Sequence, residues 1–226
     1  MTVLVITADD LGLDPRRDAG ILDAFARGAI TFTSLLVAGP SAQDAATAAR
    51  KAGLPMGLHL DLTETEPCAP AAQVSTLLDG GKKRGKHGLR AAVDRGEVDP
   101  GHVALEVEAQ LRRFEALTGA KVTHVDGHQH AHVVPGLVEI IAATLARHGV
   151  RSTRIPEQTE VQVSDPGAAR FYREVAAHAA AARVVYAREG VRSTDAFVGL
   201  DTMARRCRPR RCRRASCGTA KPGRSS

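Results

Sequence analysis

Apolar residues follow two spacings along this chain, and together the spacings predict strands that alternate with helices. Short apolar or strictly alternating runs are typical of strands, whereas apolar residues three and four positions apart are typical of amphipathic helices. The first apolar run stops at two adjacent aspartates, Asp9 and Asp10. Strands are predicted at residues 3–8, 30–39, 56–62, 121–127, 150–156 and 194–199.

Helix start and stop signals lie between these strands. Asp14 and Pro15 form an N-cap and first-turn pair for a helix that ends near Gly28. Ser41 is expected to cap the next helix, and Gly53 to end it. Residues 63–100 contain several Gly and Pro and are expected to form a long loop, a kind of segment that is often functional. Further helices are predicted at residues 102–118, 136–148 and 168–183.

The alternation of strands and helices predicts an α/β fold with a parallel sheet, either open or closed into a barrel. The chain has 226 residues, of which 43% are hydrophobic, and this is enough for one domain with its own core. We expect that domain at residues 1–203. In a barrel of this kind, catalytic groups lie at the carboxyl ends of the strands.

Aspartates and histidines follow three of the predicted strands. Asp9 and Asp10 end the first strand. In "GLHLDL", the leucines share one face of the strand and His59 points to the other. Because the carboxyl ends of parallel strands meet at one edge, all these groups are expected to lie together there. The fourth strand leads into "HVDGHQHAH", which supplies Asp126, His128, His130 and His132.

Each of these features also has a purely structural explanation. The aspartate pair is compatible with a turn at Leu11 and Gly12. His59 alone would be an ordinary core histidine, and the histidine cluster alone a solvated loop. Those explanations do not account for three such features on the same edge of a sheet, so we favour a functional site.

Charge is distributed unevenly along the chain. The net charge is +6, yet nine of the 31 Lys and Arg lie in residues 204–226, where no acidic residue occurs, and this leaves 22 basic against 25 acidic residues elsewhere. A basic arm for nucleic acid or anionic lipid is one interpretation of this tail. A metal site is less favoured, because Cys207, Cys212 and Cys217 lack a close C-x-x-C pair. We favour an out-of-frame product of GC-rich DNA.

Partners and location follow from what the sequence lacks. We expect no nucleic-acid partner unless the basic tail is genuine. No apolar run is long enough to span a bilayer, and the N-terminus does not have the order of a signal peptide. We therefore expect no membrane partner and a cytoplasmic location.

The ordered set "TADDLG", "GLHLDLTE" and "HVDGHQHAHVVPG", followed by "RIPEQ" and "TDAFVGL", resembles the YdjC-like carbohydrate deacetylase family. The resemblance covers residues 1 to about 203. It implies a TIM-like (β/α) barrel, a bound divalent metal, and removal of acetyl groups from N-acetylated sugars such as chitooligosaccharides. By this resemblance the metal ligands are Asp10, His59 and His128. We expect Mg²⁺, and Zn²⁺, Mn²⁺ and Co²⁺ also suit such a ligand set.

The remaining polar residues receive roles around that metal. By analogy with metal-dependent polysaccharide deacetylases, Asp9 is the general base beside the ligand Asp10, and an exchange of these two roles stays open. His130 is our choice for the acid that protonates the departing amine.

Three further residues are expected to support the site. Asp126 is expected to orient an imidazole, and His132 stands behind His130 as a second choice of acid. Arg154 either binds sugar hydroxyls or a neighbouring carboxylate, or is an ordinary surface arginine.

One departure from the family limits these expectations. Related sequences continue for several dozen residues after the position of Met203 and carry an "HPG" motif that is missing here. We therefore expect a barrel that is incomplete at its C-terminus, of low stability, and able to form a homodimer through its open edge. Alternatives to an active deacetylase are an inactive sugar-binding pseudoenzyme and a metal-dependent phosphoesterase.

Overall fold

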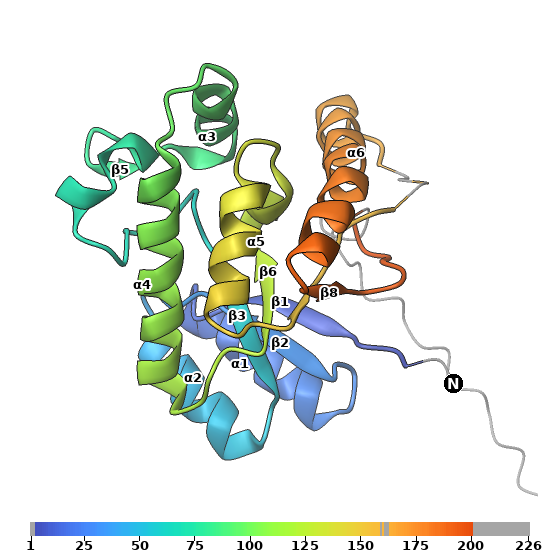
Figure 1. Cartoon of the computed structure of the whole chain (residues 1–226). Coiled ribbons are helices and arrows are strands. Elements are labelled where there is room, and N and C mark those ends of the chain that lie inside the picture. Colours follow the sequence, from blue (N-terminus) through green and yellow to red (C-terminus); the bar gives the residue numbers. More distant parts are fainter. Residues whose placement is uncertain (1–2, 159, 161–162, 201–226) are drawn as a thin grey trace, which may run out of the picture.

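The computed structural model describes residues 3–158, 160 and 163–200, which form a mixed α/β fold around one parallel sheet (Figure 1). Six strands of this sheet pair in the order β1-β2-β3-β6-β7-β8, and β4 and β5 form a separate antiparallel pair. The α/β prediction is therefore confirmed. The strands are β1 (Thr7–Leu11), β2 (Phe32–Leu35), β3 (Met56–Leu60), β4 (Leu78–Asp79), β5 (Lys82–Lys83), β6 (His124–Gly127), β7 (Ser152–Thr153) and β8 (Arg192–Ser193).

The long helices pack against one another in a continuous series. α1 contacts α2, α2 contacts α4, α4 contacts α5, and α5 contacts α6. Figure 1 shows α4, α5 and α6 side by side in front of the strands. The helices are α1 (Pro15–Ala26), α2 (Ala42–Ala52), α3 (Gly85–Asp94), α4 (Pro100–Thr118), α5 (Val138–Arg147) and α6 (Pro166–Arg188), with short 3-10 turns η1 (Ala71–Gln73), η2 (Ser75–Leu77) and η3 (His128–Val133).

The ends of the first two helices can be compared with the start and stop residues that the sequence predicts. Asp14 accepts a hydrogen bond from the Arg16 backbone, as predicted, and Gly53 ends α2 in the left-handed conformation. Ser41 is the N-cap residue of α2, as predicted, but its side chain makes no capping hydrogen bond. Its hydroxyl instead donates to the buried Asp18 carboxylate on α1, so it joins two helices.

The third strand places its side chains as predicted. Leu58, Leu60 and Leu62 are fully buried in the hydrophobic core, and α4 packs on this strand. His59 points to the opposite face of β3. The alternation along β3 therefore separates a packing face from a polar face, and the polar face carries the site.

Three element predictions are wrong. Residues 63–100 are no continuous loop, because they contain the β4–β5 pair and α3, whose Leu89 and Ala92 are buried. The first strand spans Thr7–Leu11 rather than residues 3–8, so Asp9 and Asp10 lie within the strand and not after it. The last strand lies at Arg192–Ser193 instead of residues 194–199.

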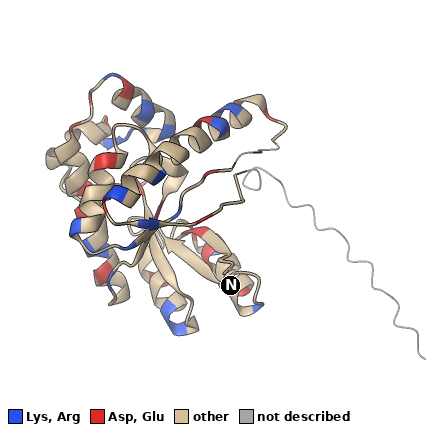
Figure 2. Cartoon of the chain, turned by 45° about the vertical axis from the view of Figure 1, so that its right-hand side comes forward, with Lys and Arg blue, Asp and Glu red and all other residues tan. Residues whose placement is uncertain are grey.

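Lys and Arg residues are interspersed with Asp and Glu residues along the helices (Figure 2). The basic tail at residues 204–226 lies outside the described residues. Within the described residues, no helix combines the length and hydropathy that a membrane span needs.

Candidate metal centre

An irregularity in β1 allows two consecutive aspartates to face the same site. Neighbouring side chains of a regular strand point to opposite faces. The pairing of β1 with β2 shifts register between Ala8 and Leu11, and Asp10 has a φ of 67°, which is uncommon for a residue other than glycine. Such a bulge redirects side chains. Asp9 and Asp10 can therefore both contact groups from neighbouring strands.

Asp10, His59 and His128 converge at the carboxyl ends of β1, β3 and β6. The Oδ1 atom of Asp10 lies 3.2 Å from Nε2 of His59 and 2.9 Å from Nδ1 of His128. The two imidazole nitrogens lie 3.4 Å apart. Both histidines are buried. One carboxylate oxygen and two imidazole nitrogens thus lie close together and could hold a metal ion.

A carboxylate lies behind each of these imidazoles. Oδ1 of Asp126 lies 2.5 Å from Nδ1 of His59, so Asp126 contacts an imidazole. Oε2 of Glu64 lies 2.8 Å from Nε2 of His128. Sequence reasoning missed Glu64, although it ends the quoted run "GLHLDLTE" directly after the third strand.

Arg154 links Asp9 to the rest of the site. Its guanidinium donates two hydrogen bonds of 2.8 Å to the Asp9 carboxylate and lies 3.3 Å from Oδ2 of Asp126. Arg154 is buried, so the alternative of a surface arginine is wrong. Nε2 of His132 donates to the Arg154 backbone carbonyl over 2.8 Å, and Tyr186 donates to the His132 carbonyl. His132 therefore supports Arg154.

Among the described residues, the His130 side chain makes no hydrogen bond or ion pair with this cluster, although the charges of Arg154 and His59 act on it. It is buried, and its Nδ1 atom has no hydrogen-bond partner. Its ring lies 6.5 Å from the ring of Phe171, between centroids. The contacts of the described residues therefore do not test the prediction that His130 is the general acid.

The charges around the cluster favour a cation. Burial raises the pKa of Asp10, but hydrogen bonds to His128 and His59 outweigh burial and hold this pKa well below its usual range. Burial lowers the pKa of His59, but the Asp126 charge and the Asp10 hydrogen bond raise it to about 10. Burial likewise raises the pKa of Asp126, and the Arg154 and His59 charges more than offset this. The carboxylates are thus ionised and attract positive charge.

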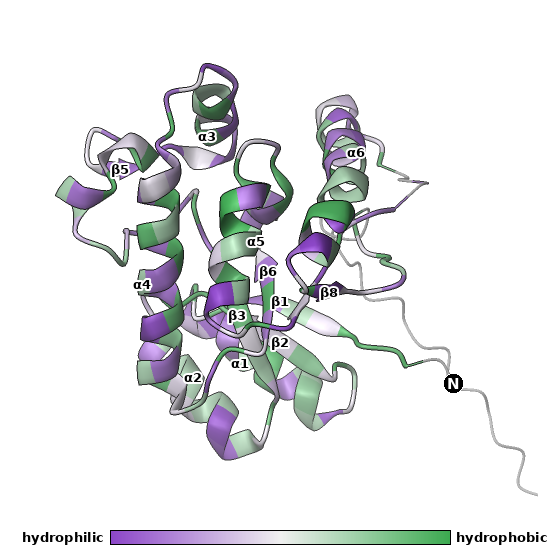
Figure 3. Ribbon diagram, viewed as in Figure 1, coloured by the Kyte–Doolittle hydropathy of each residue, from purple (hydrophilic) through white to green (hydrophobic). Residues whose placement is uncertain are grey.

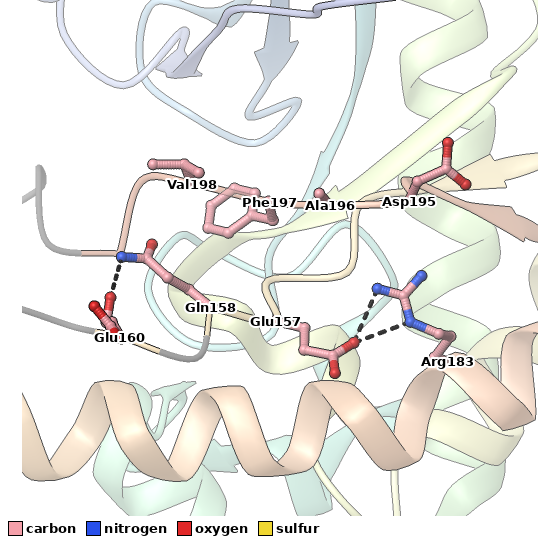
Figure 4. A pocket seen from close by; sticks show the side chains of 8 residues that line it. All are labelled: Glu157, Gln158, Glu160, Arg183, Asp195, Ala196, Phe197 and Val198. Atoms are coloured by element: carbon pink, nitrogen blue, oxygen red, sulfur yellow. Dashed lines mark hydrogen bonds and ion pairs between the residues drawn. The ribbon is translucent and has the colours of Figure 1, made fainter. Parts of the chain in front are cut away.

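An open cavity of about 710 Å³ lies beside Arg154. The Phe197 ring connects the two, because its centroid lies 5.6 Å from the Arg154 guanidinium carbon. Figure 4 shows the Glu157 carboxylate accepting from Arg183 on one side of this cavity, and Phe197 on the other. The cavity lining is Glu157, Gln158, Glu160, Arg183, Asp195, Ala196, Phe197 and Val198.

Comparisons with known proteins agree on one family. A sequence model of the family described as YdjC-like protein matches residues 3–224. A carbohydrate deacetylase of Mus musculus is 46% identical over 207 residues, which is 89% of this chain and 67% of that protein. A chitooligosaccharide deacetylase of Escherichia fergusonii is 34% identical over 172 residues, 74% of this chain and 65% of that protein.

A solved structure is also similar. It is a crystal structure of an Enterococcus faecalis protein proposed to act in cellobiose-phosphate cleavage, with a TM-score of 0.66 and 25% sequence identity. The match covers 85% of this chain and 66% of the other. The chain thus spans about two thirds of the length of the proteins it matches.

Proposed function

Because the chain belongs to the YdjC-like family, we propose that it is a metal-dependent hydrolase that removes acetyl groups from N-acetylated carbohydrates such as chitooligosaccharides. The convergence of Asp10, His59 and His128 at one edge of the sheet carries this proposal. The names of the similar proteins, carbohydrate deacetylase and chitooligosaccharide deacetylase, support the choice of substrate.

The donor set fits a divalent metal ion. Asp10, His59 and His128 supply one carboxylate oxygen and two imidazole nitrogens within 3.4 Å of one another, and these three residues would hold the ion. We propose Mg²⁺, with Zn²⁺, Mn²⁺ and Co²⁺ as alternatives. When bound, such an ion polarises an amide carbonyl and lowers the pKa of water, which amide hydrolysis needs at neutral pH.

The residues of the chain then move the protons. Asp9 accepts a proton from the attacking water, and the two hydrogen bonds from Arg154 fix its carboxylate for this task. The water oxygen bonds to the acetyl carbon, the C–N bond breaks, and the amine nitrogen takes a proton from the general acid. His130 stays our prediction for that acid.

We propose that the sheet is part of a TIM-like (β/α) barrel. The six strands pair in the order in which they occur along the chain. Right-handed crossovers in a sheet that never reverses direction put every helix on the same face, as in a barrel. Residues 1–203 remain the proposed domain. A cytoplasmic location stays a prediction.

Acetate release from N,N′-diacetylchitobiose and longer N-acetylchitooligosaccharides tests the proposed function. The purified chain should release acetate with added divalent metal, and a chelator or the His128→Ala substitution should abolish release. Release that is unaffected by chelator would contradict the metal role. A preference for phosphate esters over acetamides would instead support the phosphoesterase alternative.

A further inference from the structure

The segment that follows β3 is fixed by one buried carboxylate. Oδ1 of Asp61 accepts hydrogen bonds from the backbone and hydroxyl of Thr63 and from the backbone of Glu64. Oδ2 accepts from the backbone and hydroxyl of Thr65. A carboxylate that accepts this many hydrogen bonds holds the backbone of residues 63–65 in one conformation.

Asp61 is itself anchored inside the protein. The Lys83 ammonium is fully buried, lies 3.6 Å from Oδ2 of Asp61 and 3.2 Å from Oε1 of Glu106, and donates to the Asp61 carbonyl over 2.8 Å. Gln110 donates to Glu106 over 2.7 Å and accepts from the Asp61 backbone over 3.0 Å. Paired buried charges of this kind have little freedom to move. The backbone of residue 64 therefore rests on a rigid support.

From this support, the Glu64 side chain reaches the site. Its Oε2 atom lies 2.8 Å from Nε2 of His128, and the Gln129 side chain donates to the same oxygen over 3.0 Å. The Glu64 side chain is 51% exposed, so packing contributes little to fixing its orientation, and the two hydrogen-bond partners must do so. A half-exposed glutamate that has two partners and a fixed backbone has a defined orientation.

We propose that Glu64 is a positioning residue that orients the imidazole of His128 for metal binding, an inference that rests on the proposed function. Accepting a hydrogen bond from Nε2–H selects the tautomer in which Nδ1 carries the lone pair. That Nδ1 atom is the one that lies 2.9 Å from Oδ1 of Asp10. Glu64 thus directs the lone pair of His128 to the common point of the three donors.

The other histidine has the same arrangement, which supports this reading. Asp126 contacts Nδ1 of His59, and Nε2 of His59 faces Asp10. Imidazoles that bind metals usually donate their second N–H to a carboxylate or carbonyl, and loss of that partner typically costs 10–100-fold in metal affinity. The site therefore has two such carboxylate partners, the buried Asp126 for His59 and the half-exposed Glu64 for His128.

Metal titration of the whole chain tests the inference without relying on catalysis. Mn²⁺ and Co²⁺ are titrated calorimetrically into the metal-free wild type and into Glu64→Ala, Glu64→Gln and Glu66→Ala. Glu66 is the matched control, because its exposed side chain makes no hydrogen bond or ion pair among the described residues. We expect Glu64→Ala to bind about 10–100-fold more weakly. Glu64→Gln keeps an oxygen acceptor and should fall between Glu64→Ala and the wild type, whereas Glu66→Ala should match the wild type.

Two controls separate positioning from folding and from catalysis. Thermal melts of the metal-free Glu64→Ala and Glu66→Ala variants should agree, because the Glu64 side chain is half-exposed and water can take its place beside His128. ¹⁵N spectra of the imidazoles, with His128 assigned through His128→Ala, should show a shifted His128 resonance in Glu64→Ala and an unchanged His59 resonance. An unchanged His128 resonance, or Glu64→Ala metal affinities equal to those of the wild type, would overturn the inference.

Failure of the proposed function gives a different pattern. A wild type that binds metal but releases no acetate contradicts the deacetylase, and the titration still decides the role of Glu64. A wild type that binds neither ion overturns the inference. If Glu64→Ala binds metal normally but has a low kcat at saturating metal, Glu64 acts on the substrate, and the positioning role is wrong.

Discussion

Asp126 links the histidines of the site to Arg154, because it contacts His59 and its Oδ2 atom lies near the Arg154 guanidinium. Asn at this position would keep the shape but remove the charge that both partners need. We expect Asp126→Asn to lower the free energy of unfolding by about 3–5 kcal/mol, as breaking a buried ion pair does. Urea unfolding measures this, and calorimetric metal titration should also show weaker binding. Wild-type stability in the variant would contradict the burial of a charged Asp126.

His132 should make stability depend on pH. Burial lowers its pKa to about 4, against about 6.5 in an unfolded chain, although the hydrogen bond to the Arg154 carbonyl opposes this shift. Its folded pKa is depressed, so protonation favours unfolding. The stabilisation is complete above pH 6.5 and is lost as the pH falls through about 4, by about 3 kcal/mol in total. Urea unfolding at a series of pH values between 7 and 4 measures this. The free energy of unfolding should depend less on pH in His132→Gln than in the wild type, and an equal dependence in both would refute this assignment.

Phe197 should contribute to substrate binding and leave chemistry unchanged. Its ring lies against Arg154 at the edge of the open cavity, and apolar ring faces pack well on sugars. We expect Phe197→Ala to raise KM for chitooligosaccharides several-fold at constant kcat, because uniform binding is lost. Steady-state kinetics measure the two constants separately. A fall in kcat at unchanged KM would place Phe197 nearer to the reacting atoms.

The junction between β6 and η3 depends on the absence of a side chain at Gly127. A Cβ at this position would lie 2.2 Å from Nδ1 of His132, far inside contact distance. Gly127→Ala should therefore displace His132 and lower stability by about 1–3 kcal/mol, as overpacking does. The matched control is Gly20→Ala in α1, where a Cβ would meet nothing within 4 Å and helix propensity improves. Thermal melts should move in opposite directions, and parallel shifts would contradict the packing argument.

Sequence patterns located elements better than their ends. The predicted helix 102–118 begins two residues later than α4 and ends at the same residue, because apolar positions recur along its 19 residues. The strands β7 and β8 have two residues each, and an apolar run does not reveal how many of its residues find a hydrogen-bonded partner. Sequence reasoning missed helix α3, because the glycines and lysines in and before it leave no clear apolar pattern around the buried Leu89 and Ala92.

The site was predictable where short motifs end strands, and not where contacts join distant segments. Asp10 and His59 lie one residue before the ends of β1 and β3, and His128 directly follows β6, so the topology of a parallel sheet brings them to one edge. The contact between Glu64 and His128 depends on the conformation of residues 63–65, which the buried Asp61 fixes. No local pattern reports a contact of that kind.

At the scale of the whole molecule, β1 is an edge strand of the described sheet and is preceded by exposed apolar residues. Val3 and Leu4 are 80% and 75% exposed, and Val5 and Ile6 are exposed as well. Figure 3 shows this segment as a hydrophobic stretch leading into the sheet. An unpaired edge next to such a stretch is a template for pairing with another chain.

We therefore expect association that depends on protein concentration. A double substitution, Val3→Lys and Val5→Lys, should shift the sedimentation profile toward the monomer, because charge on an edge opposes pairing. Val184→Lys on α6 is the matched control, since Val184 is also exposed, at 70%, but is isolated on a helix. If the wild type sediments as a monomer at every concentration and melts cooperatively, the edge is protected, and both the homodimer and the low stability that we predict are wrong.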